Sequence, residues 1–188
     1  MVEIFNREDI PRWLRRFCPR ELADSVVDLS PEHLKSLGLL AIGIDLDNTL
    51  TPWKSYELGN GVEEWLQQVK ESGLKMCIIS NSRRKKRLAH LSQQLAIPYV
   101  KGPMKPRRGI LRSALKLVGV KPEEMAMIGD QMFTDVWGGN RMGMYTIWVR
   151  PIHSHEFFGT KLSRQAERWI VWLLSKHRKE TTPSPGNK

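Results

Sequence analysis

The sequence predicts an α/β protein with a mostly parallel, five-stranded sheet that is covered by helices on both faces. Short apolar segments of strand character alternate with longer segments in which apolar residues recur at helical spacing. The connections between them are short, which is typical of strand–helix–strand units. With 188 residues, the chain can form one domain with a substantial core, and two full domains are not expected.

The first 38 residues are predicted to form a lead-in of short helices. Pro11 can open one helix, because proline is favoured at the first helical position. A second helix is expected after Ser30, which is a good N-cap residue, with Pro31 at its first position and Glu32 in its first turn.

Strands and helices then alternate through the rest of the chain. Strands are expected at about 39–44, 74–79, 97–100, 125–128 and 145–149. Helices are expected at about 61–72, 83–95, 107–118, in a short stretch around Asp135, and at about 161–177. The predicted organisation is a helical lead-in (1–38), a core (39–150), a C-terminal helical extension (151–180) and a disordered tail (181–188).

Composition narrows the class of protein. The net charge of +10 indicates an anionic partner such as a phosphorylated substrate, an acidic lipid or nucleic acid, with solubility alone as the alternative. Cys18 and Cys77 lack the spacing of a metal site, so a reducing compartment is expected. The sequence shows neither a secretory signal nor a long apolar run, and we expect a cytoplasmic protein that can reach a membrane only from its surface.

Polar side chains follow three of the predicted strands. Asp45 and Asp47 follow the first core strand, Ser80 and Asn81 the second, and Asp130 the fourth. These strand ends meet at one edge of a parallel sheet, where ligands bind. Acids gathered there repel one another unless a cation is present, and oxygen ligands favour Mg²⁺. One carboxylate can then attack a phosphate while another, two residues on, transfers protons.

Four motifs, in order, resemble those of phosphatases of the haloacid dehalogenase (HAD) superfamily. The matching residues are Asp45-Leu-Asp-Asn-Thr-Leu50, Ser80, Lys105-Pro106, and Gly129-Asp130 with Thr134-Asp135. The resemblance covers roughly residues 39–150. It implies a three-layer Rossmann-like fold in which the five strands have the order 5-4-1-2-3.

The resemblance also implies the roles of the acids. Asp45 would be the nucleophile and a Mg²⁺ ligand. Asp47 would be the general acid and base and would give its backbone carbonyl to the metal. Asp130 would complete the metal site, and Asp135 would support it or bind a metal-bound water. The alternative for Asp135 is an acid on the surface of a helix. Thr49 would orient Asp47 or contact the substrate.

The other matched residues would contact the phosphate. Ser80 would bind phosphoryl oxygens, and Lys105 would bridge Asp45 and the phosphate; a helix cap and a solvated loop lysine are the respective alternatives. Asn81 could contact substrate or only shape a turn. The pair Arg83 and Arg84 could contact substrate or form a solvated surface.

Two features favour a large or membrane-anchored substrate. The segments 50–76 and 81–104 are too short to build a cap domain, so we expect an open site. Between Arg83 and Arg112 there are ten Lys or Arg and no Asp or Glu, which gives a directional positive field. The helix within this stretch opens with five cations, Arg83 to Arg87, which oppose the helix dipole. Another interaction is therefore expected to favour this arrangement.

Over residues 16–150 the chain resembles the YqeG-type branch of HAD subfamily IIIA, which is related to phosphatidylglycerophosphate phosphatases. The expected function is a Mg²⁺-dependent phosphomonoesterase that forms an aspartyl-phosphate and produces phosphatidylglycerol at the inner membrane surface. One alternative is a soluble phosphatase acting on nucleotides, sugar phosphates or nucleic-acid ends, and a second is an RNA- or ribosome-associated factor. The C-terminal run 169–174 fits either packing on the core or contact with a membrane.

Overall fold

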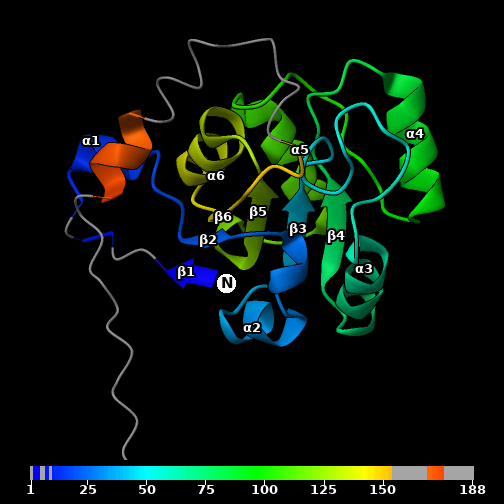
Figure 1. Cartoon of the computed structure of the whole chain (residues 1–188), viewed down its shortest axis with the longest axis horizontal. Helices are drawn as coiled ribbons and strands as arrows, with labels where there is room; N and C mark the ends of the chain where they lie inside the picture. The colour runs from blue at the N-terminus through cyan, green and yellow to red at the C-terminus, as the bar shows by residue number, and fades with distance from the viewer. Residues whose placement is uncertain (1, 5–6, 9, 154–168, 176–188) are drawn as a thin grey trace, which may run out of the picture.

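A six-stranded sheet forms the centre of the computed structural model, which describes residues 2–4, 7–8, 10–153 and 169–175. The strand order in this part of the chain is β1-β2-β6-β5-β3-β4. Every neighbouring pair is parallel except β1 with β2. The five parallel strands therefore end at one edge, and in Figure 1 the arrows of β3, β4 and β5 point up towards it.

The strands are β1 (Val2–Ile4), β2 (Glu21–Ala23), β3 (Ala41–Ile44), β4 (Lys75–Ile78), β5 (Met125–Gly129) and β6 (Tyr145–Val149). The α-helices are α1 (Arg12–Arg15), α2 (Pro31–Ser36), α3 (Val62–Glu71), α4 (Lys85–Gln94), α5 (Arg108–Val118) and α6 (Trp137–Met142). Short helical turns are η1 (Val26–Asp28), η2 (Pro122–Glu124) and the π-helix η3 (Met132–Val136). Residues 169–175 are also helical.

The sheet is covered on both faces, as the sequence predicts. On one face, α2, α3 and α4 pack against alternate strand residues such as Ile42 and Ile128. On the other face, α5 packs against Cys77 and Met127. The side chains alternate between the two faces because successive residues of a strand point in opposite directions. The fold class and the helices between the core strands are therefore confirmed.

The predicted third strand does not form a full strand of the sheet. It is reduced to a single parallel bridge between Ile78 and Tyr99, so the prediction of a full strand over 97–100 was wrong. Pro98 has no N–H to donate, and it contributes only its carbonyl, which accepts from Ile78 N at 2.8 Å. The bridge still lies beside β4, where the predicted order places it.

The lead-in adds strands that the sequence did not indicate. Its predicted helices exist as α1 and α2, and Ser30 caps α2 by accepting from His33 N at 3.1 Å. The prediction of helices alone was wrong, because β2 pairs with β6 and β1 pairs with β2. Strands of three residues carry too little periodicity to be recognised, and they form here because the edge of β6 is available.

The C-terminal helical residues 169–175 pack beside α1 (Figure 1, orange). Ile170 and Leu174 are buried with Leu14 of α1 and Met132 of η3. Trp169 and Trp172 are 57% and 52% exposed, so one side of this helix packs and another faces solvent. The predicted helical residues 161–168 and 176–177 and the predicted tail lie outside the described residues. Within the described residues, no helix has the length and apolar character needed to span a membrane.

Candidate active site

Strand β3 delivers Asp45 to the carboxyl edge of the sheet. The N–H of Asp45 donates to the carbonyl of Ile128 at 2.9 Å, which extends the pairing of β3 with β5 by one residue. Only 3% of Asp45 is exposed. Asn48 then reverses the chain in the left-handed region, at φ 61°, a conformation that asparagine tolerates better than most residues.

Lys105 reaches the same point from the loop before α5. Its Nζ lies 2.6 Å from Asp45 Oδ1 and 2.7 Å from Asp135 Oδ1, and the side chain is buried. Lys105 is therefore part of the site rather than a solvated loop lysine. Asn81 holds this loop: Lys105 N donates to Asn81 Oδ1 at 2.7 Å, and Asn81 Nδ2 donates to the Lys105 carbonyl at 3.1 Å. The side chain of Asn81 therefore holds the backbone of Lys105, and its contact with substrate stays a prediction.

Three acids face one another next to Lys105. Carboxylate oxygens of Asp45, Asp130 and Asp135 all lie within 4.8 Å of one another. Among the described residues, nothing donates a hydrogen bond to the buried atoms Asp45 Oδ2 and Asp130 Oδ1. Buried carboxylate oxygens without donors are expensive unless a cation binds them. The three acids therefore fit a divalent metal.

Burial and mutual repulsion shift the pKa values of this cluster. The pKa of Asp45 rises from its ordinary value of 3.8 to about 7, mainly because the side chain is buried, with Lys105 opposing the rise and Asp135 adding to it. Burial also raises the pKa of Asp130, with Asp45 as the next cause. Burial lowers the pKa of Lys105, but Asp135 and Asp45 more than offset this effect and raise it overall. A bound cation would favour the ionised acids.

Asp135 is placed by a close approach to the backbone of β5. Its carboxylate occupies the space where a side chain at Gly129 would begin, and Asp135 Oδ2 accepts from Gln131 N at 3.1 Å. Asp135 lies on the π-helix η3 and is only 1% exposed, so it is not an acid on a helix surface. Such π-helical turns are frequent at functional sites.

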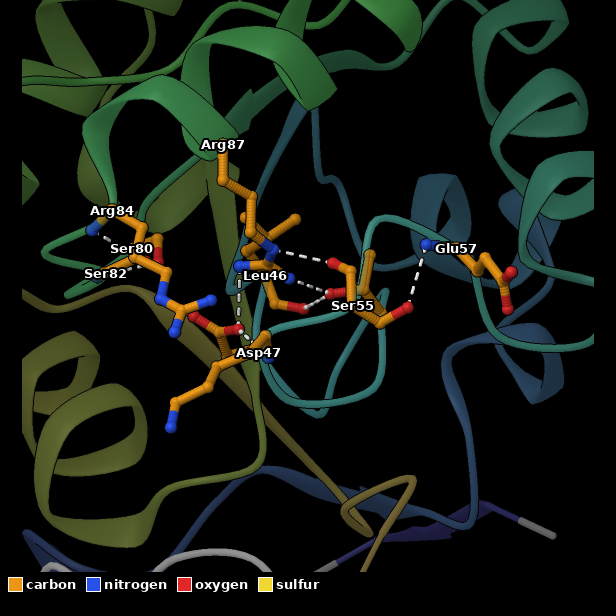
Figure 2. A network of polar contacts seen from close by, with 10 residues as sticks. Leu46, Asp47, Ser55, Glu57, Ser80, Ser82, Arg84 and Arg87 are labelled. Atoms are coloured by element: carbon orange, nitrogen blue, oxygen red, sulfur yellow. Dashed lines mark hydrogen bonds and ion pairs between the residues drawn. The ribbon is translucent and has the colours of Figure 1, made fainter.

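The side chain of Asp47 is held by a residue that the sequence analysis did not single out. Arg87 Nη1 donates to Asp47 Oδ1 at 2.8 Å, as Figure 2 shows. Thr49 was expected to orient Asp47, but its hydroxyl is buried and has no hydrogen-bond partner among the described residues. A signal for Arg87 was present: it lies four residues before Leu91 and eight before Leu95, on the inward face of α4.

The remaining predicted contacts lie around the same edge. Ser80 is buried beyond the end of β4, and its Oγ accepts from Ser82 N at 3.1 Å. Arg83 and Arg84 are exposed just before α4. Nothing in their contacts decides whether they bind substrate, and this role stays a prediction.

This combination of fold and site defines a class of hydrolase. The family model of the haloacid dehalogenase-like hydrolases matches residues 11–143, and the chain belongs to this family. HAD phosphatases typically use a divalent metal, and the buried acids are arranged accordingly. The enzyme is a phosphoric monoester hydrolase.

The chain is similar to several named phosphatases. The chain is 37% identical to the probable phosphatase YqeG of Bacillus subtilis, over 85% of this chain and 92% of that protein. It is 31% identical to the glyceraldehyde 3-phosphate phosphatase of Pyrococcus furiosus, over 48% of this chain and 41% of that protein. It is 30% identical to the chloroplastic phosphatidylglycerophosphate phosphatase 1 of Chlamydomonas reinhardtii, over 81% of this chain and 60% of that protein.

Solved structures confirm the fold. An uncharacterized protein from Listeria monocytogenes serotype 4b superposes with a TM-score of 0.52 at 17% sequence identity. The match covers 73% of this chain and 99% of that chain. At this level of identity the likeness concerns the fold alone.

Proposed function

We propose that this enzyme is a Mg²⁺-dependent phosphatase that removes the terminal phosphate of phosphatidylglycerophosphate at the surface of an anionic membrane. The observation that carries the proposal is a buried site of three acids and a lysine at a sheet edge surrounded by exposed cations. Within the described residues, the segments after β3 and β4 contain α3 and α4 but no cap domain. A phosphate on a large anchored molecule can therefore approach.

The reaction begins at Asp45. One of its carboxylate oxygens attacks phosphorus, the bond from phosphorus to the alcohol oxygen breaks, and an aspartyl-phosphate forms. Asp47 gives a proton to the departing alcohol oxygen. Asp47 then takes a proton from water, which attacks phosphorus and releases phosphate and free Asp45. Lys105 stabilises the charge on the transferred group, and Ser80 donates a hydrogen bond to it.

Asp45, Asp130 and Asp135 would hold the Mg²⁺, with the backbone carbonyl of Asp47. The bound ion would neutralise phosphoryl oxygens and thereby let a carboxylate and a phosphate dianion approach each other. The donor set is made only of oxygens, which suits Mg²⁺ better than a softer metal.

The basic stretch from 83 to 112 divides between the site and the surface. Two of its cations, Arg87 and Lys105, are buried in the site. The others are exposed: Arg83, Arg84, Lys85, Lys86, Lys101, Arg107, Arg108 and Arg112. Most lie near the N-terminal ends of α4 and α5, on the same sheet edge as Asp45. This surface would attract an anionic membrane.

Exposed tryptophans supply a second contact. Trp13 of α1 is 48% exposed, and Trp169 and Trp172 are exposed on the adjacent C-terminal helix. This pair of helices packs on Met132, which precedes Asp135 in η3. Tryptophan favours the boundary between lipid and water. The algal relative, which is named for phosphatidylglycerophosphate, supports the same substrate.

A second candidate is a soluble phosphatase for small phosphate esters. It is favoured by the relative named for glyceraldehyde 3-phosphate, which matches about half of this chain. An RNA-binding role for the basic stretch is a third outcome, and it would appear as salt-sensitive RNA binding that survives Asp45→Asn.

The deciding experiment compares substrates under one condition. Purified protein with Mg²⁺ should release phosphate from phosphatidylglycerophosphate in anionic vesicles faster than from glyceraldehyde 3-phosphate. Asp45→Asn should abolish both activities, and vesicle flotation should show that this variant still binds membranes. Efficient hydrolysis of the soluble ester with no release from the lipid would overturn the proposed substrate.

A further inference from the structure

Arg87 lies on the buried face of α4, at a position where the pattern of an amphipathic helix predicts an apolar residue. It lies on the inward face of α4 with Leu88 and Leu91, and only 1% of it is exposed. Burying a guanidinium group costs several kcal/mol unless hydrogen bonds and an opposite charge compensate it, and an apolar side chain of similar volume is often as stable or more stable there. Core packing alone therefore does not explain an arginine.

The hydrogen bonds of Arg87 all converge on the loop that carries Asp47. Nη1 donates to Asp47 Oδ1 at 2.8 Å, Nη2 to Thr51 Oγ1 at 2.7 Å, and Nε to the Ser55 carbonyl at 2.6 Å. Figure 2 shows the side chain extending from α4 to Asp47 and Ser55. Because the guanidinium is planar and rigid, three bonds of this kind fix the position of one carboxylate oxygen relative to the loop.

The other oxygen of Asp47 is left available. Oδ1 accepts from Arg87 and, at 3.3 Å, from Lys54 N, whereas no described residue donates to Oδ2. The Asp47 side chain is 16% exposed, whereas the Arg87 side chain is buried, so protein binds the carboxylate through Oδ1 while part of the side chain stays accessible.

We propose that Arg87 is a positioning residue that holds Asp47 with its free oxygen directed at the leaving alcohol. The inference rests on the proposed function, in which Asp47 is the general acid. It explains one of the cations that oppose the dipole of α4: Asp47 requires Arg87, which acts through Asp47 rather than by touching the substrate.

The inference predicts a dependence on the leaving group. An alkyl alcohol needs a proton as it departs, whereas p-nitrophenolate leaves without one. If Asp47 is displaced, hydrolysis of the alkyl phosphate should therefore become slower, whereas hydrolysis of p-nitrophenyl phosphate should change little. The ratio kcat/KM includes the steps up to departure of the alcohol, so it isolates this role of Asp47 from its later role toward water.

The experiment compares Arg87→Lys and Arg87→Met with wild type, using glycerol 3-phosphate and p-nitrophenyl phosphate in the presence of Mg²⁺. We expect kcat/KM for the alkyl ester to fall about 10- to 100-fold and that for the nitrophenyl ester to fall less than about 3-fold. Arg87→Lys keeps the charge and should retain part of the activity. The matched control is Lys116→Ala, which removes an exposed positive charge from α5. This variant should behave as wild type.

A double-mutant cycle separates positioning from a merely structural role. In an Asp47→Asn background, Arg87→Met should have little further effect on the alkyl ester, because the acid it positions is gone. Equal losses on both esters, or the same loss with and without Asp47, would overturn the inference while leaving the proposed phosphatase intact. Inactivity of the wild type toward every phosphate ester would instead overturn the proposed function, and the inference with it. If Arg87→Met does not fold, as judged by circular dichroism, Arg87→Lys decides by the same ratio.

Discussion

At the scale of single residues, the site depends on charges that are paired in the interior. Lys105 lies between Asp45 and Asp135, and Arg87 is bound to Asp47. Each cation is buried, so each pair is held in one arrangement that solvent screens little. Removing a single partner leaves a buried charge without compensation, which is why substitutions here are expected to have large effects.

The first residue-scale prediction concerns the two acids of the first motif. Asp45→Asn removes the proposed nucleophile, and Asp47→Asn removes the proposed proton donor, so each should reduce turnover of an alkyl phosphate by at least about 100-fold. Phosphate release by purified variants measures the effect, with the melting temperature as a check of folding. Normal turnover in either variant would contradict the assigned roles.

The second residue-scale prediction concerns pH and metal. Because the pKa of Asp45 is about 7 when folded and 3.8 ordinarily, the folded chain retains a proton that the unfolded chain releases. Without metal, the contribution of Asp45 to stability is therefore fully present below about pH 4 and is lost as the pH rises through 7. The raised pKa of Asp130 acts in the same direction.

Melting temperatures in chelator should accordingly fall between pH 5 and pH 8. Mg²⁺ should raise the melting temperature more at pH 8, where the acids ionise without a competing proton. Asp45→Asn should make the chelator profile flatter. A wild-type profile in chelator that matches that of Asp45→Asn would show that Asp45 does not titrate in this way.

At the scale of elements, one side chain joins the lead-in to the core. Asn140 of α6 donates from Nδ2 to the carbonyls of Arg16 and Cys18, at 3.0 and 2.9 Å, and accepts at Oδ1 from Arg7 and Thr146. Beside it, β2 pairs with β6 along Glu21 to Ala23. These contacts tie the lead-in to the sheet next to η3, which carries Asp135.

The element-scale prediction follows from the hydrogen bonds of Asn140. Asn140→Ala should lower the free energy of unfolding by about 2–3 kcal/mol, because several partly buried groups lose their partner together. Urea unfolding measures this change. Gln67→Ala, which removes an amide with a single exposed hydrogen bond on α3, is the control and should change stability by less than about 0.5 kcal/mol. Equal effects of the two substitutions would argue against a special role of Asn140 in joining the lead-in to the core.

At the scale of the whole molecule, positive charges and exposed aromatic side chains are unevenly distributed over the surface, which would orient the protein on a membrane. Most of the exposed cations between Arg83 and Arg112 lie near the N-terminal ends of α4 and α5, at the edge of the sheet where Asp45 lies. Trp169 and Trp172 are exposed on the C-terminal helix, whose buried residues pack with Met132 of η3. If this edge meets an anionic bilayer, charge provides attraction at a distance and the tryptophans provide contact.

The whole-molecule prediction tests that orientation. Trp169→Ala combined with Trp172→Ala should weaken binding to anionic vesicles by about tenfold or more, because exposed aromatic area no longer enters the lipid boundary. Vesicle flotation at low salt measures binding, and p-nitrophenyl phosphate turnover should be unaffected. Leu117→Ala, which removes an exposed apolar side chain at the C-terminal end of α5, should bind normally. Unchanged binding of the tryptophan variant would place the membrane contact elsewhere.

The sequence by itself determined the alternation of strands and helices and the identity of most site residues. Both are local properties: β5 shows its buried side chains over consecutive residues, and Asp45, Ser80 and Asp130 follow directly after their strands. Because parallel strands end at one edge, these positions in the sequence were sufficient to predict that the three residues lie along that edge.

Only the tertiary structure decided which partners those residues have. Arg87 finds Asp47 across 40 residues, and Asn81 binds the backbone of Lys105 across 24. Strands β1 and β2 form because an edge of the sheet is open beside them. The physical reason is the same in each case: the free energy of a buried charge, amide or strand edge depends on the groups that folding brings around it, and a sequence pattern does not contain those neighbours.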